Sequence, residues 1–320
     1  RQKARARRNF TDNDVIILLF GRIALDDKMD IAPIFSALRR VADDDPKISV
    51  HLLVAGSVRQ GDPYTGFLED AARALHVNVR LEQNPTKDDK RELFAAADVF
   101  VSPVDNIQET FGLTLLEAGA AGLPILASDW DGYRDLVQDG QSGFLIPTLA
   151  SEHTPWLDTV AHSLGDNQHQ MLRGQRTALD VPAMAAAIRR LACDPGLRRS
   201  MGEAGRELVL SRFTWSVVVK QWLDLWEELN GLALPPEEES RVRKARHPLF
   251  LDLGKAFAGY ASELLKEGES AFFLKTSRRG ERLRAGQEQV GAWLGVEQGM
   301  KNVDLRKLLT LARRPISIAQ

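Results

Sequence analysis

The sequence contains one cysteine and no long apolar run. Because Cys193 is the only cysteine among 320 residues, the chain can form neither an intrachain disulfide nor a metal site built from several thiolates. The scarcity of cysteine is typical of a reducing compartment, and we expect a cytoplasmic setting. No apolar run approaches the roughly 20 residues that a membrane-spanning helix needs, and no signal-peptide pattern opens the chain.

Several cofactor signatures are also missing. The glycine-rich fragments fit neither G-x-G-x-x-G nor the P-loop spacing, which disfavours a nicotinamide dehydrogenase and a P-loop nucleotide hydrolase. None of the six histidines has zinc-ligand spacing. Asp129-Trp130-Asp131 has the D-x-D form of some metal-binding loops, but its place after an apolar strand favours a structural loop. We therefore expect no metal and no cofactor.

Charge is unevenly distributed along the chain. The net charge is −2, but residues 241–320 contain 16 Lys and Arg against 8 Asp and Glu, whereas residues 1–240 contain 26 against 36. This balance does not indicate a nucleic-acid-binding protein. The basic tail could contact an anionic membrane surface, an acidic partner or a second copy of the chain, and a solvated basic face is the simpler alternative.

Residues 11–147 alternate between short apolar runs and helical patterns. Continuous apolar strands separated by helices predict an α/β fold, a Rossmann-like parallel sheet with helices on both faces. In such sheets ligands bind beyond the carboxyl ends of the strands, where the strand order reverses. The expected strands are residues 14–20, 49–55, 77–81, 99–101, 125–127 and 144–146, and the expected helices between them include 31–41, 63–75 and 88–96.

The pattern divides the chain into three parts. Residues 1–10 are basic, bury no obvious face and are interpreted as a linker, residues 11–230 as the Rossmann-like domain, and residues 231–320 as a basic helical extension. Within the domain, residues 149–175 are predicted to be an irregular insertion, and Trp222 and Trp226 to lie in the core. Further helices are expected at 181–193, 196–210, 214–229, 249–265, 281–293 and 303–312.

Two carboxylates flank the start of a predicted helix. Glu109 follows the strand that ends at Val101, and Thr110-Phe111-Gly112 then turns into the helix that carries Glu117. A helix N-terminus exposes N–H groups that suit a phosphate or a set of hydroxyls, and Gly112 allows close backbone approach. The two carboxylates could accept hydrogen bonds from hydroxyls at two places along one ligand.

The stretch from Glu109 to Pro124, E-T-F-G-L-T-L-L-E-A-G-A-A-G-L-P, resembles the Glu-x7-Glu motif of the retaining glycosyltransferases similar to glycogen synthase and sucrose synthase, often called family 4. That motif has the form E-G-F-G-L-x-x-x-E-A-M-A-x-G-x-P, so Thr110 and Gly119 depart from it. The resemblance implies that Glu109 contacts the donor sugar and Glu117 the nucleotide ribose. It also implies a cradle for the sugar and distal phosphate, made by the backbone of Thr110, Phe111, Gly112, Leu113 and Thr114.

A second segment upstream resembles another signature of this family. Gly21-Arg-Ile-Ala-Leu-Asp-Asp-Lys-Met29 is similar to G-R-x-x-x-x-K-G, with one extra residue before Lys28 and methionine in place of the last glycine. Arg22 and Lys28 could stabilise a leaving diphosphate without a metal. By the same resemblance, Gly56 and Ser57 approach the phosphates, and the loop that ends at Asn84 holds the base.

The resemblance implies the C-terminal, donor-binding half of a GT-B glycosyltransferase, whose N-terminal domain lies outside this chain. With that domain, we expect transfer of a sugar from a nucleoside diphosphate to an acceptor hydroxyl with retention. Alone, the chain is expected to bind the donor nucleotide sugar and turn over little or none. A nucleotide-sugar epimerase of the same architecture and a noncatalytic nucleotide-sugar-binding module remain the alternative hypotheses.

Overall fold

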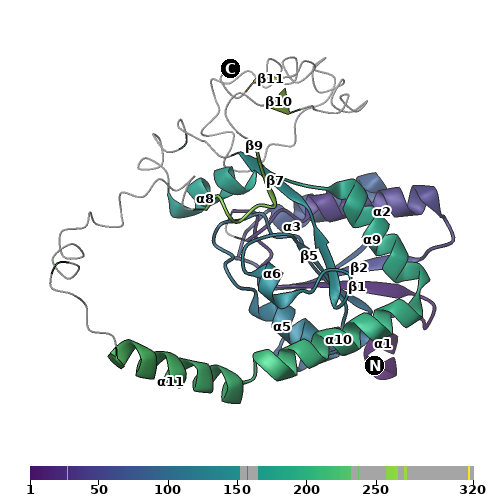
Figure 1. Ribbon diagram of the computed structural model, residues 1–320. Coiled ribbons are helices and arrows are strands. Elements are labelled where there is room, and N and C mark those ends of the chain that lie inside the picture. Colours follow the sequence, from purple (N-terminus) through teal and green to yellow (C-terminus); the bar gives the residue numbers. More distant parts are fainter. Residues whose placement is uncertain are drawn as a thin grey trace.

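A computed structural model shows an α/β domain built on a parallel sheet (Figure 1). The structure describes residues 1–26, 28–151, 157, 165–231, 237, 257–265, 270–271 and 316–317. The strands of the main sheet are β1 Val15–Phe20, β2 Val50–Gly56, β3 Asn78–Gln83, β4 Val99–Ser102, β5 Ile125–Ser128 and β6 Gly143–Ile146. Each of the six expected strands is confirmed, with small shifts of the ends.

The strand order is β3-β2-β1-β4-β5-β6, and all neighbours are parallel. β4 and β5 are buried along their whole length, as their continuous apolar sequences predict. The order reverses between β1 and β4, because the chain first builds outward to β3 and then restarts on the other side of β1. This reversal places the loops after β1 and β4 next to each other.

Helices cover both faces of the sheet. α2 packs against α3 and α9, and α5 packs against α10; Figure 1 shows these two groups on opposite faces. A capping box between Thr86 and Asp89 starts α4. The helices in this part are α2 Ala32–Asp44, α3 Tyr64–Leu75, α4 Lys87–Ala96, α5 Leu113–Ala120, α6 Tyr133–Leu136, α9 Val181–Cys193, α10 Pro195–Arg212 and α11 Trp215–Gly231.

The first ten residues are not a linker without a buried face, so that expectation is wrong. Residues Gln2–Ala6 form helix α1, which packs against α4. Arg5 is only 2% exposed, and its guanidinium donates hydrogen bonds to the side chain of Asp98 and to three backbone carbonyls. Such contacts allow a charged residue to be buried. An interpretation that treats only apolar residues as buried does not detect this helix.

A small second sheet replaces part of the irregular insertion expected at 149–175. β7 Thr148–Ser151 pairs antiparallel with β8 Thr177–Leu179 and parallel with β9 Glu263–Leu265. Helix α8 Asp166–Gly174 lies between β7 and β8 in the sequence. Strands of three or four residues that pair with a distant segment carry little periodic signal, and the sequence pattern therefore missed them.

Residues 257–265 attach to the domain, and the helix expected at 249–265 is wrong over this range. Ala261 forms a β-bridge with Trp130, and the rings of Trp130 and Tyr260 meet edge to face at 5.7 Å. Ser262 and Thr148 exchange hydrogen bonds, including Thr148 N to Ser262 Oγ at 2.7 Å. The helices expected at 281–293 and 303–312 lie outside the described residues.

The residues of the Asp129-Trp130-Asp131 segment contact other parts of the protein. Oδ1 of Asp129 accepts a hydrogen bond from Nε of Arg134 at 2.5 Å, and Trp130 is buried. The backbone N–H of Asp131 donates to the carbonyl of Tyr260 at 3.0 Å. These contacts agree with the structural loop expected from the sequence.

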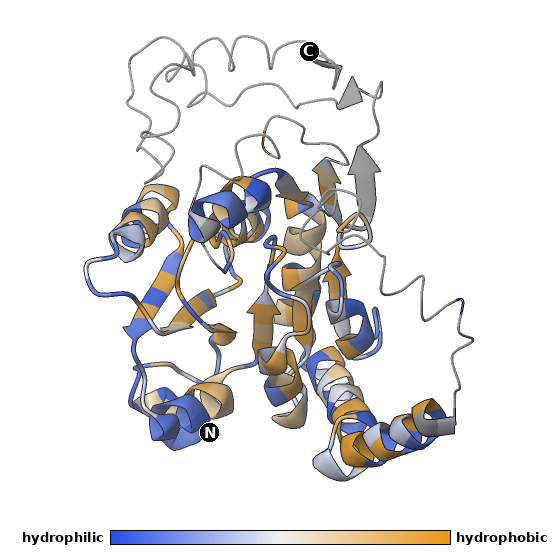
Figure 2. Cartoon of the chain, turned by 90° about the vertical axis from the view of Figure 1, so that its left-hand side faces the viewer, coloured by the Kyte–Doolittle hydropathy of each residue, from blue (hydrophilic) through white to orange (hydrophobic). Residues whose placement is uncertain are grey.

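Trp222 and Trp226 are not core residues, so that expectation is wrong. Both side chains are 54% exposed on α11, which projects from the domain (Figure 1) and carries apolar residues along its length (Figure 2). Helical periodicity shows that α11 has an apolar face but does not show what covers it. Among the described residues, no helix combines the length and the apolar character required to span a bilayer.

Candidate functional site

The loops after β1 and β2 are joined directly at the carboxyl edge of the sheet. The N–H of Gly21 donates to the carbonyl of Ala55 at 3.1 Å, and the N–H of Ile23 donates to the carbonyl of Ser57 at 2.9 Å. Gly56 lies so close to Gly21 that an added Cβ would overlap the Gly21 carbonyl oxygen and lie 2.6 Å from its carbon. Glycine at position 56 is therefore required for this approach of two backbones.

Asn84 ties the loop after β3 to the same edge. Its N–H donates to the carbonyl of Gly56 at 2.7 Å, and its side-chain Oδ1 accepts from the N–H of Val58 at 3.1 Å. The backbone of Asn84 is left-handed, with φ of 53°, a conformation that asparagine tolerates better than most residues. Asn84 thus positions the loop after β2, whatever its contact with a ligand.

The loops that carry Lys28 and Glu109 meet where the strand order reverses. Nζ of Lys28 forms an ion pair with Oε2 of Glu109, and both side chains are 14% exposed. Arg22 lies at the same edge, and its Nη2 donates to Oε1 of Gln108 at 3.2 Å. Buried Asn106 shapes the turn, since its side chain accepts from the N–H of Gln108 at 2.9 Å. Two cationic side chains from the loop after β1 and one carboxylate from the loop after β4 therefore lie at the same edge of the sheet.

A tight turn fixes the backbone from Thr110 to Gly112. Gly112 has φ of 94°, and a Cβ on it would lie 2.5 Å from the ring of Tyr133. A Cβ on Gly132 would overlap the carbonyl oxygen of Thr110. Tyr133 is itself held by a 2.8 Å hydrogen bond between its hydroxyl and Ser102. This packing leaves Gly112 at the start of α5 with no room for a side chain.

Side chains in this turn and directly after it are partly exposed. Phe111 and Leu113 are exposed, and the ring of Phe111 meets Phe213 edge to face at 6.2 Å. Thr114 lies in the first turn of α5 and is half-buried. The side chains on either side of buried Gly112 thus reach the surface.

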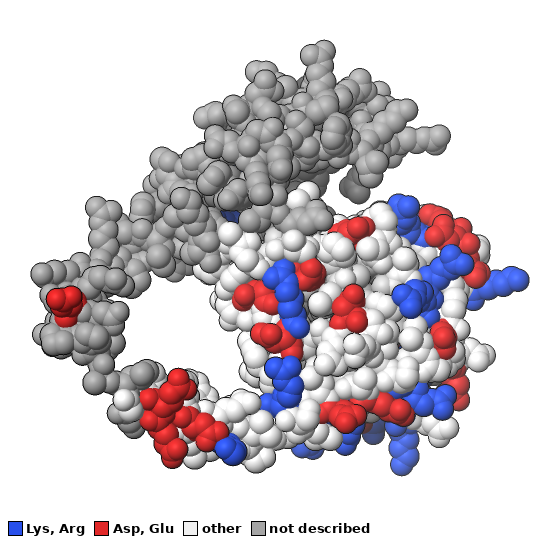
Figure 3. All heavy atoms as spheres, viewed as in Figure 1, with Lys and Arg blue, Asp and Glu red and all other residues white. Residues whose placement is uncertain are grey.

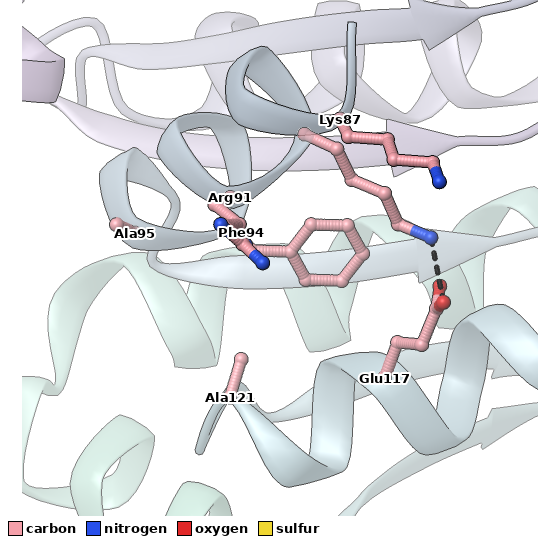
Figure 4. A pocket seen from close by; sticks show the side chains of 7 residues that line it. Lys87, Arg91, Phe94, Ala95, Glu117 and Ala121 are labelled. Atoms are coloured by element: carbon pink, nitrogen blue, oxygen red, sulfur yellow. Dashed lines mark hydrogen bonds and ion pairs between the residues drawn. The ribbon is translucent and has the colours of Figure 1, made fainter.

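Glu117 lies on α5 and contacts α4. Its Oε1 accepts a hydrogen bond from Nζ of Lys90 at 2.6 Å. The two residues line a pocket between α4 and α5 together with Lys87, Arg91, Phe94, Ala95 and Ala121 (Figure 4). The sequence predicted Glu117 but offered no signal for Lys90, because the approach of α4 to α5 is a tertiary contact.

Charge alone does not single out the site. On the face drawn in Figure 3, described Lys and Arg side chains are interspersed with Asp and Glu side chains. The cations at the candidate site are instead distinguished by their partners, since Lys28 pairs with Glu109 and Lys90 with Glu117. The candidate site is therefore distinguished by these two ion pairs and not by an extended region of positive electrostatic potential.

Two acidic residues that the sequence analysis did not predict, buried Asp105 and half-buried Asp30, support the same loops. The N–H of Asp30 donates to Oδ2 of Asp105 at 3.3 Å, and the hydroxyl of Tyr64 donates to Oδ1 of Asp30 at 3.4 Å. Burial, with the nearby charge of Asp30, raises the pKa of Asp105 to about 8. Burial also raises the pKa of Asp30. The pair joins the loop that carries Lys28 to the loop that carries Glu109.

We expect Asp105→Asn to flatten the pH dependence of stability. Unfolded aspartate loses its proton near pH 4, whereas folded Asp105 keeps it up to a pKa of about 8. Between these values the folded chain binds more protons, so the free energy of unfolding falls as pH rises. Because asparagine cannot ionise, the variant should be more stable than the unchanged protein by about 1 kcal/mol or more near pH 8, and similar near pH 4.

Urea unfolding of both proteins across this pH range measures the difference. Because the charge of Asp30 raises the pKa of Asp105, the difference between the two curves measures the ionisation of Asp105 together with its coupling to Asp30. Parallel stability curves for the two proteins would show that Asp105 is already ionised at neutral pH.

Comparison with known proteins adds to this geometry. Residues 1–156 match the family described as "Glycosyl transferases group 1". D-inositol 3-phosphate glycosyltransferase of Streptomyces bingchenggensis is 28% identical over 233 residues, which are 71% of this chain and 44% of the relative. Alpha-maltose-1-phosphate synthase of Mycolicibacterium smegmatis is 30% identical over 141 residues, which are 44% of this chain and 30% of the relative.

A solved structure shows the same fold. WaaG, a glycosyltransferase involved in lipopolysaccharide biosynthesis, has a TM-score of 0.50 and 22% identity, over 69% of this chain and 49% of that chain. At this level of identity the likeness concerns the fold, a Rossmann-like unit of the GT-B architecture. The matched parts span less than half of the length of each of these three proteins.

Proposed function

Because residues 1–156 match the glycosyl transferases group 1 family, we propose that this chain binds a nucleoside-diphosphate sugar. Together with an N-terminal domain outside these 320 residues, it transfers the sugar to an acceptor hydroxyl with retention. The observation that carries the proposal is the meeting of Arg22, Lys28 and Glu109 at the reversal of strand order. That is the edge at which parallel α/β sheets bind ligands.

Each residue has a distinct role in this proposal. Arg22 and Lys28 stabilise the negative charge that develops on the leaving diphosphate, and Glu109 accepts hydrogen bonds from the sugar hydroxyls. Lys28 already pairs with Glu109, so the two side chains lie close enough to act on neighbouring parts of one donor. The Phe111–Leu113 turn faces the same ligand, and Glu117 holds the ribose.

The leaving group needs no metal in this scheme. Two side chains of fixed positive charge supply the stabilisation that a divalent cation supplies elsewhere. The leaving phosphate takes the proton from the acceptor hydroxyl, since none of the residues assigned here is a general base.

Nucleotide binding tests the proposal on the chain as it stands. Calorimetric titration with UDP, GDP and ADP, and with their glucose or mannose conjugates, should show saturable binding of one base. Arg22→Ala and Glu117→Ala should each weaken that binding by roughly tenfold or more, because each removes a charge-assisted hydrogen bond.

Arg39→Ala provides a matched control, because Arg39 is a surface arginine on α2 that pairs with Asp43. It should bind the nucleotide as the unchanged chain does. Equal binding by all three variants would contradict the assigned pocket. In a protein that includes the N-terminal domain, glycoside formation supports transfer, whereas an epimerised nucleotide sugar would favour the epimerase hypothesis.

A further inference from the structure

Lys90 contacts residues of β1, of its own helix α4 and of α5. Its Nζ donates to Oε1 of Glu117 at 2.6 Å and lies 5.0 Å from the ring centre of Phe20 and 6.0 Å from that of Phe94. Phe20 ends β1, Phe94 belongs to α4, and Glu117 belongs to α5. The two rings also pack against each other, with their centres 5.6 Å apart. These contacts restrict the otherwise flexible lysine side chain.

The ion pair restricts Glu117 in turn. The carboxylate is 43% exposed, so without a partner it would sample several rotamers. Among the described residues, Oε1 has Lys90 as its side-chain partner, and no hydrogen bond to Oε2 is present. A carboxylate can accept about four hydrogen bonds. The pair therefore fixes the orientation of Glu117 and leaves acceptor sites for two ligand hydroxyls.

Lys90 differs from the other cations of this pocket. Lys87 and Arg91 also line it (Figure 4), but Arg91 pairs with exposed Asp88 on its own helix. The dashed line in Figure 4 marks the contact between Lys90 and Glu117. Lys90 is thus a pocket-lining cation that pairs with Glu117. The proposed function assigns the carboxylate of Glu117 to the ribose.

We propose that Lys90 is a positioning residue that holds Glu117 in the orientation in which its carboxylate accepts hydrogen bonds from the ribose hydroxyls of the donor. This inference rests on the proposed function and extends it to a residue that does not touch the nucleotide. Fixing the carboxylate before binding removes part of the ordering cost of the complex. The pair thereby favours ribonucleotides over nucleotides that lack both hydroxyls.

The test compares ligands with and without the ribose hydroxyls. UDP, GDP and ADP, and the 2′,3′-dideoxy form of each, are titrated into the unchanged chain and into Lys90→Gln. The substitution should weaken binding of the ribonucleotide by about threefold to tenfold and leave the dideoxynucleotide nearly unaffected. Lys90→Arg should restore most of the loss, because arginine can donate to the same carboxylate.

Two further variants control for charge and packing. Lys220→Gln removes a lysine from a surface ion pair on α11, with Asp224, outside this pocket and should change neither ligand's affinity. Lys90→Met keeps an apolar stem against Phe20 and Phe94 and should bind like Lys90→Gln, which separates the ion pair from the packing.

Each other outcome overturns the inference. Equal weakening of both ligands would mean that Lys90 contacts the phosphates or the base, and unchanged binding by Lys90→Gln would mean that Glu117 needs no partner. If the unchanged chain binds none of the ribonucleotides, the proposed function fails and this inference fails with it. That result is recognised in the unchanged chain alone, before any variant is compared.

Discussion

Gly56→Ala should lower the free energy of unfolding by about 3 kcal/mol or more, which is large for the addition of one methyl group. The new Cβ would overlap the carbonyl oxygen of Gly21 and lie 2.6 Å from its carbon and 3.2 Å from its nitrogen. All three atoms belong to backbone, so no side-chain rotation can relieve the contact. Urea unfolding measures the effect on stability, and nucleotide titration measures the accompanying loss of binding.

Gly66→Ala is the matched control for this substitution. A Cβ on Gly66 meets no atom within 4 Å, and the residue lies in helix α3. Alanine there should stabilise the protein by about 0.5–1 kcal/mol, because it restricts the unfolded chain and favours the helix. An unchanged urea midpoint for Gly56→Ala would show that the loops after β1 and β2 can separate without cost.

Arg5→Ala should destabilise the protein by about 3 kcal/mol, because it removes one donor from a buried carboxylate, which keeps Arg1 and the N–H of Ile16, and removes a donor from each of three carbonyls. Arg5 donates to Oδ2 of Asp98 at 3.0 Å and to the carbonyls of Ala96, Thr11 and Asp14 at 3.1, 2.6 and 2.5 Å. The side chain of Asp98 is only 8% exposed. Thermal and urea unfolding of the variant measure the loss.

Arg7→Ala is the control that removes one positive charge from helix α1 without removing the buried contacts of Arg5. Arg7 is 67% exposed and pairs with Glu92 at the surface, where an ion pair contributes at most about 1 kcal/mol. The variant should therefore unfold close to the unchanged protein. Similar losses for Arg5→Ala and Arg7→Ala would contradict a special role for the buried guanidinium.

The main sheet could be predicted because its strands are continuous apolar runs bounded by glycine or polar loops. The run from Val15 to Phe20 and the helix from Val181 to Cys193 agree closely with expectation. The edges of the domain could not be predicted in the same way. β9 forms only through pairing with β7, and the apolar face of α11 gave no indication that Trp222 and Trp226 are exposed.

Part of the candidate site followed from the carboxyl-end rule and the two motifs. These placed Arg22, Lys28 and Glu109 at one edge, and the structure brings them together. Their roles toward a donor stay predictions. The supporting residues were missed, because Lys90 and Asp105 acquire their partners only when separate loops and helices pack.

The strand order also shapes the folding route of the protein. β1 pairs with β2 and β2 with β3, while β4, β5 and β6 form a second series of neighbours. The two series join through β1 and β4, where Ile17 pairs with Val99 across a long stretch of chain. Closing that stretch costs entropy that local pairings avoid. A nucleotide bound across this seam would act as a noncovalent crosslink between the two series of strands, because each series carries residues of the proposed site.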